Sequence, residues 1–146
     1  MRVHVCAVGR ARSGPERALF DDYAARFDRT GRALGLGPLR IHEVEDRKGG
    51  GAAAEAALLE RTIPKGARLV ALDERGAAIG SPAFADRLAG WRDDGCSDLA
   101  FVIGGADGLA SDLCARADLA LSFGPMVWPH MLARVMLAEQ LYRAAS

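Results

Sequence analysis

The sequence lacks the features that mark several classes of protein. Its three cysteines, Cys6, Cys96 and Cys114, are far apart and form no CxxC pair, which argues against a disulfide framework and against a zinc site. We expect them to act as small buried hydrophobic residues in a reducing compartment. No apolar run approaches the ~18 residues of a membrane span, and the short start MRVHVCAVG is unlike a signal peptide. We therefore expect a cytoplasmic protein.

The chain also lacks an excess of either charge. Nineteen basic and 19 acidic residues give a formal net charge of zero, which removes the simplest indication of a nucleic-acid-binding domain. The two halves differ, because residues 1–68 hold 13 basic and 9 acidic residues whereas residues 69–146 hold 6 and 10. This distribution permits an anionic partner near the N-terminal half without requiring one.

The sequence does contain a regular alternation of short aliphatic runs with segments of helical periodicity. Strands are expected at residues 3–8, 39–44, 68–72, 99–103 and 119–123, and helices at about residues 15–34, 52–62, 81–93, 111–117 and 129–145. Ser81 before Pro82 has the pattern of a helix N-cap. The alternation and the nearly continuous apolar strands predict a single α/β domain over residues 1–146, with three layers around a mostly parallel sheet of about five to six strands.

Ligands of open parallel sheets bind beyond the carboxyl ends of the strands. The motif IGGADG, residues 103–108, follows such a strand, and its glycines would let the backbone approach a ligand closely. It is neither a dinucleotide fingerprint nor a P-loop, and ordinary turn chemistry explains it equally well. Asp73 in LDERG could hold a ribose hydroxyl or cap a turn. The segment DRKGGG, residues 46–51, is either a solvated connection or a mobile basic loop that touches phosphate.

The segment FGPMVWPH, residues 123–130, is unusually apolar and stiff for a connection between a strand and a helix. It suggests a wall around a flat apolar group such as adenine, a contact with another subunit, or ordinary core packing. In the helix that follows, His130 and Arg134 share a face at spacing i,i+4. The other positions are mostly apolar, which predicts a buried helix or an oligomer interface. No catalytic carboxylate pair, nucleophile–base set or metal-ligand cluster stands out.

Five segments of the chain together resemble a known family. They are VHVCAVG, LVALDERG, SPAFADRLAGW, LAFVIGGADGL and LSFGPMVWPHMLARVMLAEQLYRA, and they cover essentially the whole chain in order. The family is that of the RlmH-type large-subunit rRNA pseudouridine N3-methyltransferases, members of the SPOUT (trefoil-knotted) superfamily. The IGG-x-x-G block and the PH-x-L-x-R-x-x-L-x-EQ-LYRA block are specific in combination.

The resemblance implies a deep C-terminal trefoil knot, S-adenosylmethionine (SAM) as the cofactor, and a homodimer with the last helix in its interface. The implied substrate is a pseudouridine in helix 69 of 23S rRNA within the assembled ribosome. Carried over by position, the cofactor-binding residues are Leu72, Gly104, Gly105, Gly108, Phe123, Gly124, Pro125, Met126, Val127 and Trp128. The implied catalytic residues are His130 and Arg134, and the candidate RNA contacts are Tyr142, Arg143, Arg47 and Lys48.

The implied chemistry fits these residues. Methyl transfer from a sulfonium is a one-step in-line displacement, so it requires positioning and desolvation but no metal. Removing the N3 proton of pseudouridine calls for a base, or for cations that stabilise the anion. Family members usually continue past the last helix into a short tail with a Tyr-His-Arg motif, whereas this chain ends at Ser146. We therefore expect cofactor binding from these 146 residues and associate methyl transfer with the tail.

Two other hypotheses stay open from the sequence. One is a Rossmann-type oxidoreductase, with IGGADG on a pyrophosphate and Asp73 on a ribose. In that fold, however, the glycine-rich loop follows the first strand, whereas here it follows the fourth. The other is a ribosome-binding module without catalysis. Binding of a nicotinamide cofactor would favour the first, and methyl transfer to ribosomes would exclude the second.

Overall fold

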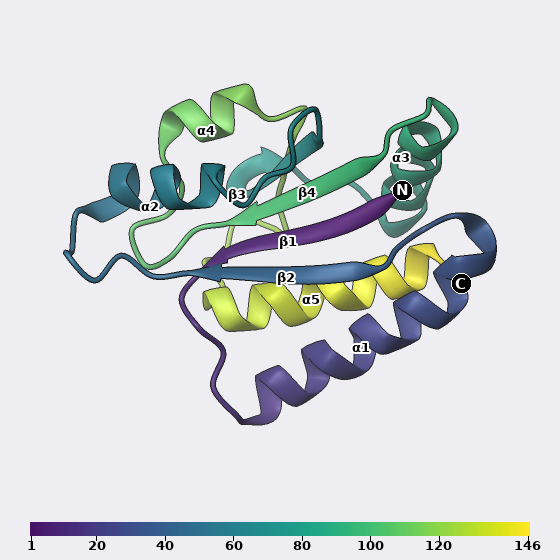
Figure 1. The fold of residues 1–146 in the computed structure, drawn as a ribbon, viewed down its shortest axis with the longest axis horizontal. Coiled ribbons are helices and arrows are strands. Elements are labelled where there is room, and N and C mark those ends of the chain that lie inside the picture. Colours follow the sequence, from purple (N-terminus) through teal and green to yellow (C-terminus); the bar gives the residue numbers. More distant parts are fainter.

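A five-stranded, all-parallel sheet forms the centre of the structure (Figure 1). The computed structural model describes residues 1–146, and the strands lie in the order β2-β1-β4-β3-β5. Their bounds are Arg2–Val8 (β1), Leu39–Val44 (β2), Arg68–Ala77 (β3), Asp98–Ile103 (β4) and Leu119–Leu121 (β5). The predicted α/β class with a parallel sheet is thereby confirmed.

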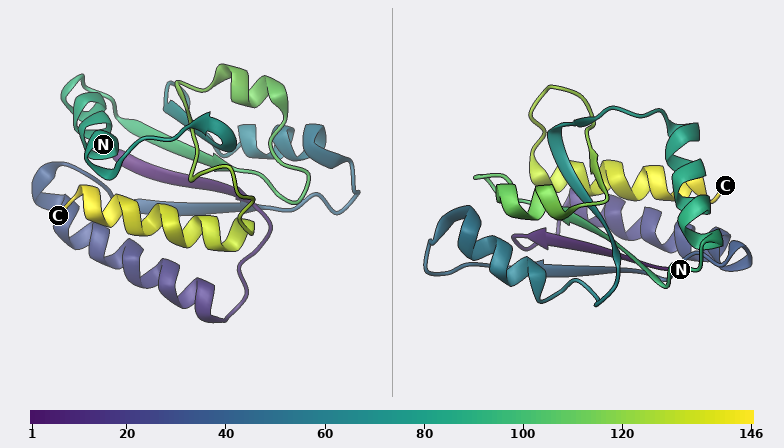
Figure 2. Two further views of the ribbon diagram at one scale, coloured as in Figure 1. Left: turned by 180° about the vertical axis from the view of Figure 1, so that it is seen from behind. Right: turned by 90° about the horizontal axis from the view of Figure 1, so that it is seen from above.

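Helices cover both faces of this sheet. They are α1 (Pro15–Gly31), α2 (Gly51–Glu60), α3 (Ser81–Asp93), α4 (Ser111–Arg116) and α5 (His130–Ala144), and a short 3₁₀ helix, Arg32–Leu34, extends α1. The helices α1, α3 and α5 pack on one face, while α2 and α4 pack on the other. Figure 2 shows α1 and α5 lying side by side. No helix has the length and apolar character needed to cross a membrane.

The neighbouring strands β1 and β4 are buried on both sides, which explains why their sequences are mostly apolar instead of alternating. In β1, Val3 and Val5 contribute to the core shared with α1, α3 and α5, whereas Cys6 and Val8 contribute to the core under α2 and α4. Every residue of β4 is buried. The sheet is therefore a rigid base from which the loops at its carboxyl edge project.

Four local predictions were inaccurate. Strand β3 was expected to end at Leu72 but continues to Ala77, and β5 ends at Leu121, two residues before the expected end. Ser81 is not the N-cap of α3, because Gly80 occupies that position and the Ser81 hydroxyl donates a hydrogen bond to Gln140 Oε1 at 2.7 Å. Of the cysteines expected to be buried, Cys6 is, whereas the other two are half-buried.

The extension of β3 depends on an unusually close approach to β5. Leu121 pairs with both Leu72 and Ala77, so β3 bulges between these two positions. Within the bulge, a Cβ at Gly76 would lie 2.5 Å from the carbonyl oxygen of Ala120, a distance that only glycine accommodates. The approach brings the end of β3 against the start of the loop that follows β5. The trefoil knot in this region stays a prediction.

Candidate functional site

The glycine-rich loop, the start of α5 and the end of β1 meet at the carboxyl edge of the sheet. A Cβ on Gly9, just after β1, would lie 3.2 Å from Cε1 of His130. A Cβ on Gly105, just after β4, would lie 3.0 Å from Cγ1 of Val8. The end of β1 thus touches both the glycine-rich loop and the first residue of α5, and these elements form one continuous surface.

The glycine-rich loop folds tightly on itself. The Gly108 N–H donates to the Gly105 carbonyl at 3.0 Å, and Gly108 has a φ of 74°. A Cβ on Gly104 would lie 2.5 Å from the carbonyl carbon of Gly108, so a side chain at Gly104 would force the loop open. The loop therefore presents backbone groups, with little side-chain cover, to anything that binds at this edge.

The loop after β5 forms an apolar wall beside this edge. Leu72 pairs with Leu121 at its base, and Phe123 packs against the core. Farther along, Met126, Val127 and Trp128 are 72%, 78% and 42% exposed, which is high for such large apolar residues.

Hydrogen bonds fold the start of this loop back toward β3. The Ser122 hydroxyl accepts the Gly124 N–H at 3.0 Å and lies 2.9 Å from the Glu74 carbonyl. The Trp128 indole N–H donates to the Phe123 carbonyl at 3.4 Å. The predicted cofactor residues Leu72 and 123–128 are thus contiguous in space.

His130 begins α5, and the structure leaves it a free hydrogen-bonding atom. Its ring rests against Gly9, and its Nδ1 is buried without a partner in the chain. An imidazole nitrogen in this state can accept or donate a proton to a bound molecule. The resemblance implies a catalytic role for His130 without deciding between a base and a cation, and this geometry is compatible with either.

Arg134 is engaged in a different way, although it lies one turn along the same helix. Its side chain is only 2% exposed, and its guanidinium donates to Glu43 Oε2 at 2.6 Å and to the carbonyls of Val8 and Gly9 at 3.1 and 2.7 Å. Burial of Glu43 opposes its ionisation, but hydrogen bonds from Ala11 N–H and Arg134 outweigh it and lower the pKa of Glu43 below its usual value. Arg134 therefore ties α5 to the ends of β1 and β2.

Glu55 of α2 is a polar residue of this edge that the sequence did not reveal. Its Oε2 lies 3.2 Å from the position of a Cβ on Gly105, and its Oε1 is buried without a hydrogen-bond partner. Burial, with smaller contributions from the charges of Asp107 and Asp46, raises the pKa of Glu55. The only signal in the sequence is a single acid in the middle of the alanine-rich run GAAAEAALLE.

Asp73 lies within β3 and is already paired. Its carboxylate accepts the backbone N–H of Arg75 at 3.0 Å and the Arg75 guanidinium at 3.2 Å. These hydrogen bonds are the main reason why the pKa of Asp73 lies below its usual value. The structure thus favours the structural interpretation of Asp73 over ribose binding.

The candidate RNA contacts fall into two separated groups. Arg47 and Lys48 are exposed in the turn after β2, on the same edge as the glycine-rich loop. Tyr142 and Arg143 lie at the opposite end of α5, about 18 Å along the helix axis from His130. Within one chain, therefore, they do not form a single surface.

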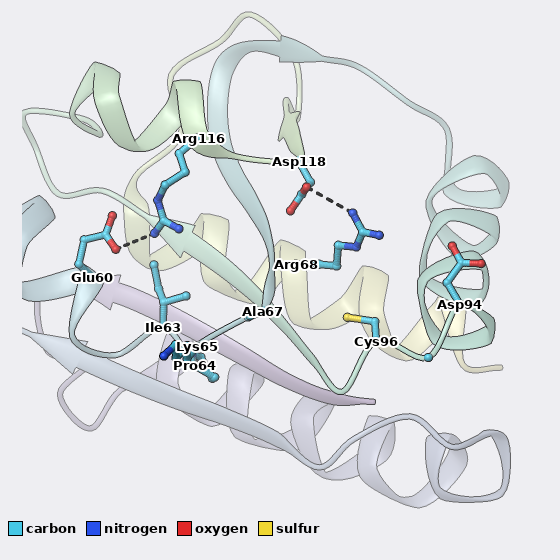
Figure 3. Close-up of a pocket in the computed structure, with 12 residues that line it drawn as sticks. Glu60, Ile63, Pro64, Lys65, Ala67, Arg68, Asp94, Cys96, Arg116 and Asp118 are labelled. Carbon is cyan, nitrogen blue, oxygen red and sulfur yellow. Dashed lines mark hydrogen bonds and ion pairs between the residues drawn. The ribbon is translucent and has the colours of Figure 1, made fainter.

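A cavity of about 610 Å³ opens at the opposite, amino-terminal edge of the sheet (Figure 3). Several of the charged side chains that line it pair with one another, since Arg116 pairs with Glu60 at 2.6 Å and Arg68 with Asp118 at 3.5 Å. None of the predicted site residues lines it. We therefore assign the candidate site to the carboxyl edge, where the loops converge and polar atoms lack partners.

Comparison with known proteins identifies the family. A family model described as "Predicted SPOUT methyltransferase" matches residues 1–146. The chain belongs to this family of SPOUT methyltransferases.

Among curated proteins, the chain is 69% identical to "Ribosomal RNA large subunit methyltransferase H" of Dinoroseobacter shibae and 67% identical to the protein of that name in Ruegeria pomeroyi. Each match covers 100% of this chain and 94% of the relative.

Matches to solved structures occur at low sequence identity. A putative methyltransferase from Legionella pneumophila, solved in complex with SAM, gives a TM-score of 0.50 at 14% identity, covering 99% of this chain and 66% of the other. TrmJ from Z. mobilis ZM4 gives a TM-score of 0.48 at 16% identity, covering 97% of this chain and 68% of the other. The likeness to the Legionella pneumophila protein concerns the fold alone.

Proposed function

We propose that this chain is a SAM-dependent rRNA methyltransferase that methylates N3 of a pseudouridine in helix 69 of 23S rRNA in the assembled ribosome. The observation that carries the proposal is the 69% identity, over the whole chain, to a protein named as a large-subunit rRNA methyltransferase. We further propose that a single domain spanning residues 1–146 acts as a homodimer in the cytoplasm, where ribosomes are found.

The residues at the carboxyl edge suit SAM. The backbone of Gly104, Gly105 and Gly108 leaves room for a ligand, and the wall formed by Leu72 and residues 123–128 offers apolar surface to an adenine ring. When bound, SAM supplies a methyl group on a sulfonium that a nucleophile takes in one displacement. These loops orient the donor and exclude water, which is the main requirement of such a reaction.

The proton on N3 must leave before or during methyl transfer, and His130 is the residue we propose to accept it. Its unpartnered Nδ1 supports this role. The family resemblance implied that Arg134 is catalytic together with His130, but the three contacts of Arg134 within the chain support a positioning role instead. By fixing Val8 and Gly9, Arg134 holds the surface on which His130 rests.

The proposed dimer rests on apolar surface beside α5. Leu132, Met126, Val127 and Trp128 are exposed. A groove of about 430 Å³, lined mainly by apolar side chains of α1, α3, α5 and the loop after β5, lies next to them. A second copy packed here would cover this surface. It would also bring the RNA contacts of the second chain near the site. Within one chain, Arg143 lies too far from His130 to contribute to the same surface.

Calorimetric titration of the chain with SAM, with NADH as the control ligand, tests the cofactor assignment. Saturable binding of SAM and no binding of NADH are expected. Binding of NADH alone would instead support the Rossmann-type oxidoreductase.

Methyl transfer is tested with labelled SAM and ribosomes that lack the modification. We expect label on N3 of one pseudouridine in 23S rRNA. If the protein binds SAM and ribosomes but transfers no methyl group, it is a ribosome-binding module without catalysis. Label at another position would refute the proposed substrate.

The dimer is tested by sedimentation at micromolar protein. A mass of two chains is expected, and Leu132→Glu should shift the equilibrium toward one chain because it places a charge in the proposed apolar interface. Leu34→Glu, on an exposed residue of the 3₁₀ helix that does not line this groove, shows whether a new charge elsewhere on the surface has the same effect. A single chain in the unsubstituted protein would refute the dimer.

A further inference from the structure

Glu55 is the one carboxylate at the carboxyl edge whose position the fold does not explain. It projects from α2 toward the glycine-rich loop, with Oε2 beside Gly105 and Oε1 buried without a donor. Of the other carboxylates of this region, Glu43 pairs with Arg134 and Asp46 accepts the backbone N–H groups of Lys48 and Gly50. Asp107 has no such partner but is exposed to solvent. Glu55 makes no ion pair.

The Glu55 side chain is only half-buried, but a carboxylate oxygen buried without a donor is costly unless something else supplies a hydrogen bond and a positive charge. The charges nearest to Glu55 belong to Asp107 and Asp46, which repel it and add to the effect of burial on its pKa. Nothing within the chain compensates this cost. The arrangement is therefore best explained by a cationic hydrogen-bond donor that arrives with a ligand.

We propose that Glu55 binds the α-ammonium group of the methionine part of SAM, an inference that rests on the proposed function. SAM carries two positive centres, but the sulfonium has no N–H or O–H to donate, whereas the ammonium has three N–H donors. Only the ammonium supplies both the charge and the hydrogen bond that Glu55 Oε1 lacks. The position of Oε2 beside Gly105 places this contact at the loop assigned to the cofactor.

The test compares three ligands by calorimetry. SAM has the ammonium and the sulfonium, S-adenosylhomocysteine keeps only the ammonium, and methylthioadenosine lacks the whole amino-acid part. Glu55→Gln preserves the size of the side chain and removes its charge. This variant is expected to weaken the binding of SAM and of S-adenosylhomocysteine alike by about 10- to 100-fold, which is the effect of losing one charge-assisted hydrogen bond. The affinity for methylthioadenosine should not change.

The matched control is Glu60→Gln, on the last residue of the same helix. Glu60 lines the cavity at the amino-terminal edge of the sheet and pairs with Arg116 on the surface. Its substitution should therefore not change the affinity for any of the three ligands. Circular dichroism and thermal unfolding should show that Glu55→Gln folds at least as stably as the unsubstituted chain, because the variant removes the charge of a carboxylate whose buried oxygen has no donor.

Each remaining outcome has a separate meaning. Equal SAM affinity of Glu55→Gln and the unsubstituted chain refutes the inference and leaves the proposed function standing. Weaker binding of methylthioadenosine would mean that Glu55 acts on the ribose or on the loop itself, and an effect confined to SAM would point to the sulfonium; both refute the ammonium contact. If the unsubstituted chain does not bind SAM, the proposed function fails first and the inference fails with it.

Discussion

Replacing Arg134 with methionine should destabilise the protein far more than an ordinary substitution on a helix. The methionine keeps an apolar stem of similar length but removes the guanidinium, which is 2% exposed and makes three hydrogen bonds. Glu43 and the carbonyls of Val8 and Gly9 then lose a donor in a buried place. Breaking a buried ion pair by removing one partner costs ~3–5 kcal/mol.

The lower end of this range applies here. The Glu43 side chain is 21% exposed and keeps the hydrogen bond from the backbone N–H of Ala11, so its charge stays partly compensated after the change. We therefore expect Arg134→Met to lower the free energy of unfolding by about 3 kcal/mol. The free energy of unfolding of Arg134→Lys should lie between those of Arg134→Met and the unsubstituted chain. The lysine ammonium keeps the charge but lacks the forked guanidinium that reaches both Glu43 and the β1 carbonyls.

Urea unfolding at fixed protein concentration measures these differences, since assembly makes apparent stability depend on concentration. A double-mutant cycle with Glu43→Gln isolates the ion pair, and the two changes should be non-additive by about 1 kcal/mol or more. A loss below about 1 kcal/mol for Arg134→Met, or strict additivity with Glu43→Gln, would refute the anchoring role. Since Val8 and Gly9 support Gly105 and His130, weaker SAM binding should accompany the loss of stability.

Two further predictions concern other parts of the chain. Gly104→Ala should reduce SAM binding strongly, because the new methyl group would lie 2.5 Å from the carbonyl carbon of Gly108 and would open the loop; calorimetry measures the effect. The stability of the protein should fall as the pH drops below 6.5, because burial and the charges of His4 and Arg40 lower the pKa of His42, so the unfolded chain takes up that proton more readily than the folded one.

Each of these two predictions has a control and a result that would contradict it. Gly90→Ala lies in α3 with open space around its Cβ, so it should leave SAM binding intact and stabilise the helix by about 0.5–1 kcal/mol. Equal binding by Gly104→Ala and Gly90→Ala would contradict the first prediction. For the second, urea midpoints of the unsubstituted chain and His42→Gln are compared at pH 7.5 and 5.5, both about one unit from the ordinary histidine pKa. The unsubstituted chain should lose more stability, and parallel behaviour of the two would contradict the assignment to His42.

The sequence alone determined the order and type of the secondary-structure elements. The strand predicted at residues 39–44 matches β2 at both ends, and the helix predicted at 81–93 matches α3. These elements are readable because their periodicity is a local property and glycine, proline or aspartate marks their ends. The glycine-rich loop and the apolar segment after β5 were also recognisable, since each departs from ordinary turn composition.

Only the tertiary structure decided the features that depend on contacts between distant segments. Residues 73–77, with the sequence DERGA, carry no strand signal of their own, and they extend β3 because Ala77 pairs with Leu121 of β5. Arg134 was grouped with His130 by its spacing, yet its partners come from β1 and β2, far away in the sequence.

Glu55 likewise reads as one acid in an alanine-rich helix until the packing of α2 places it beside Gly105. The pattern of the sequence thus fixes which elements form, because that depends on neighbours along the chain. Which side chains are left without a partner depends on how the elements pack, and this is what singles out Glu55 and His130 at the candidate site.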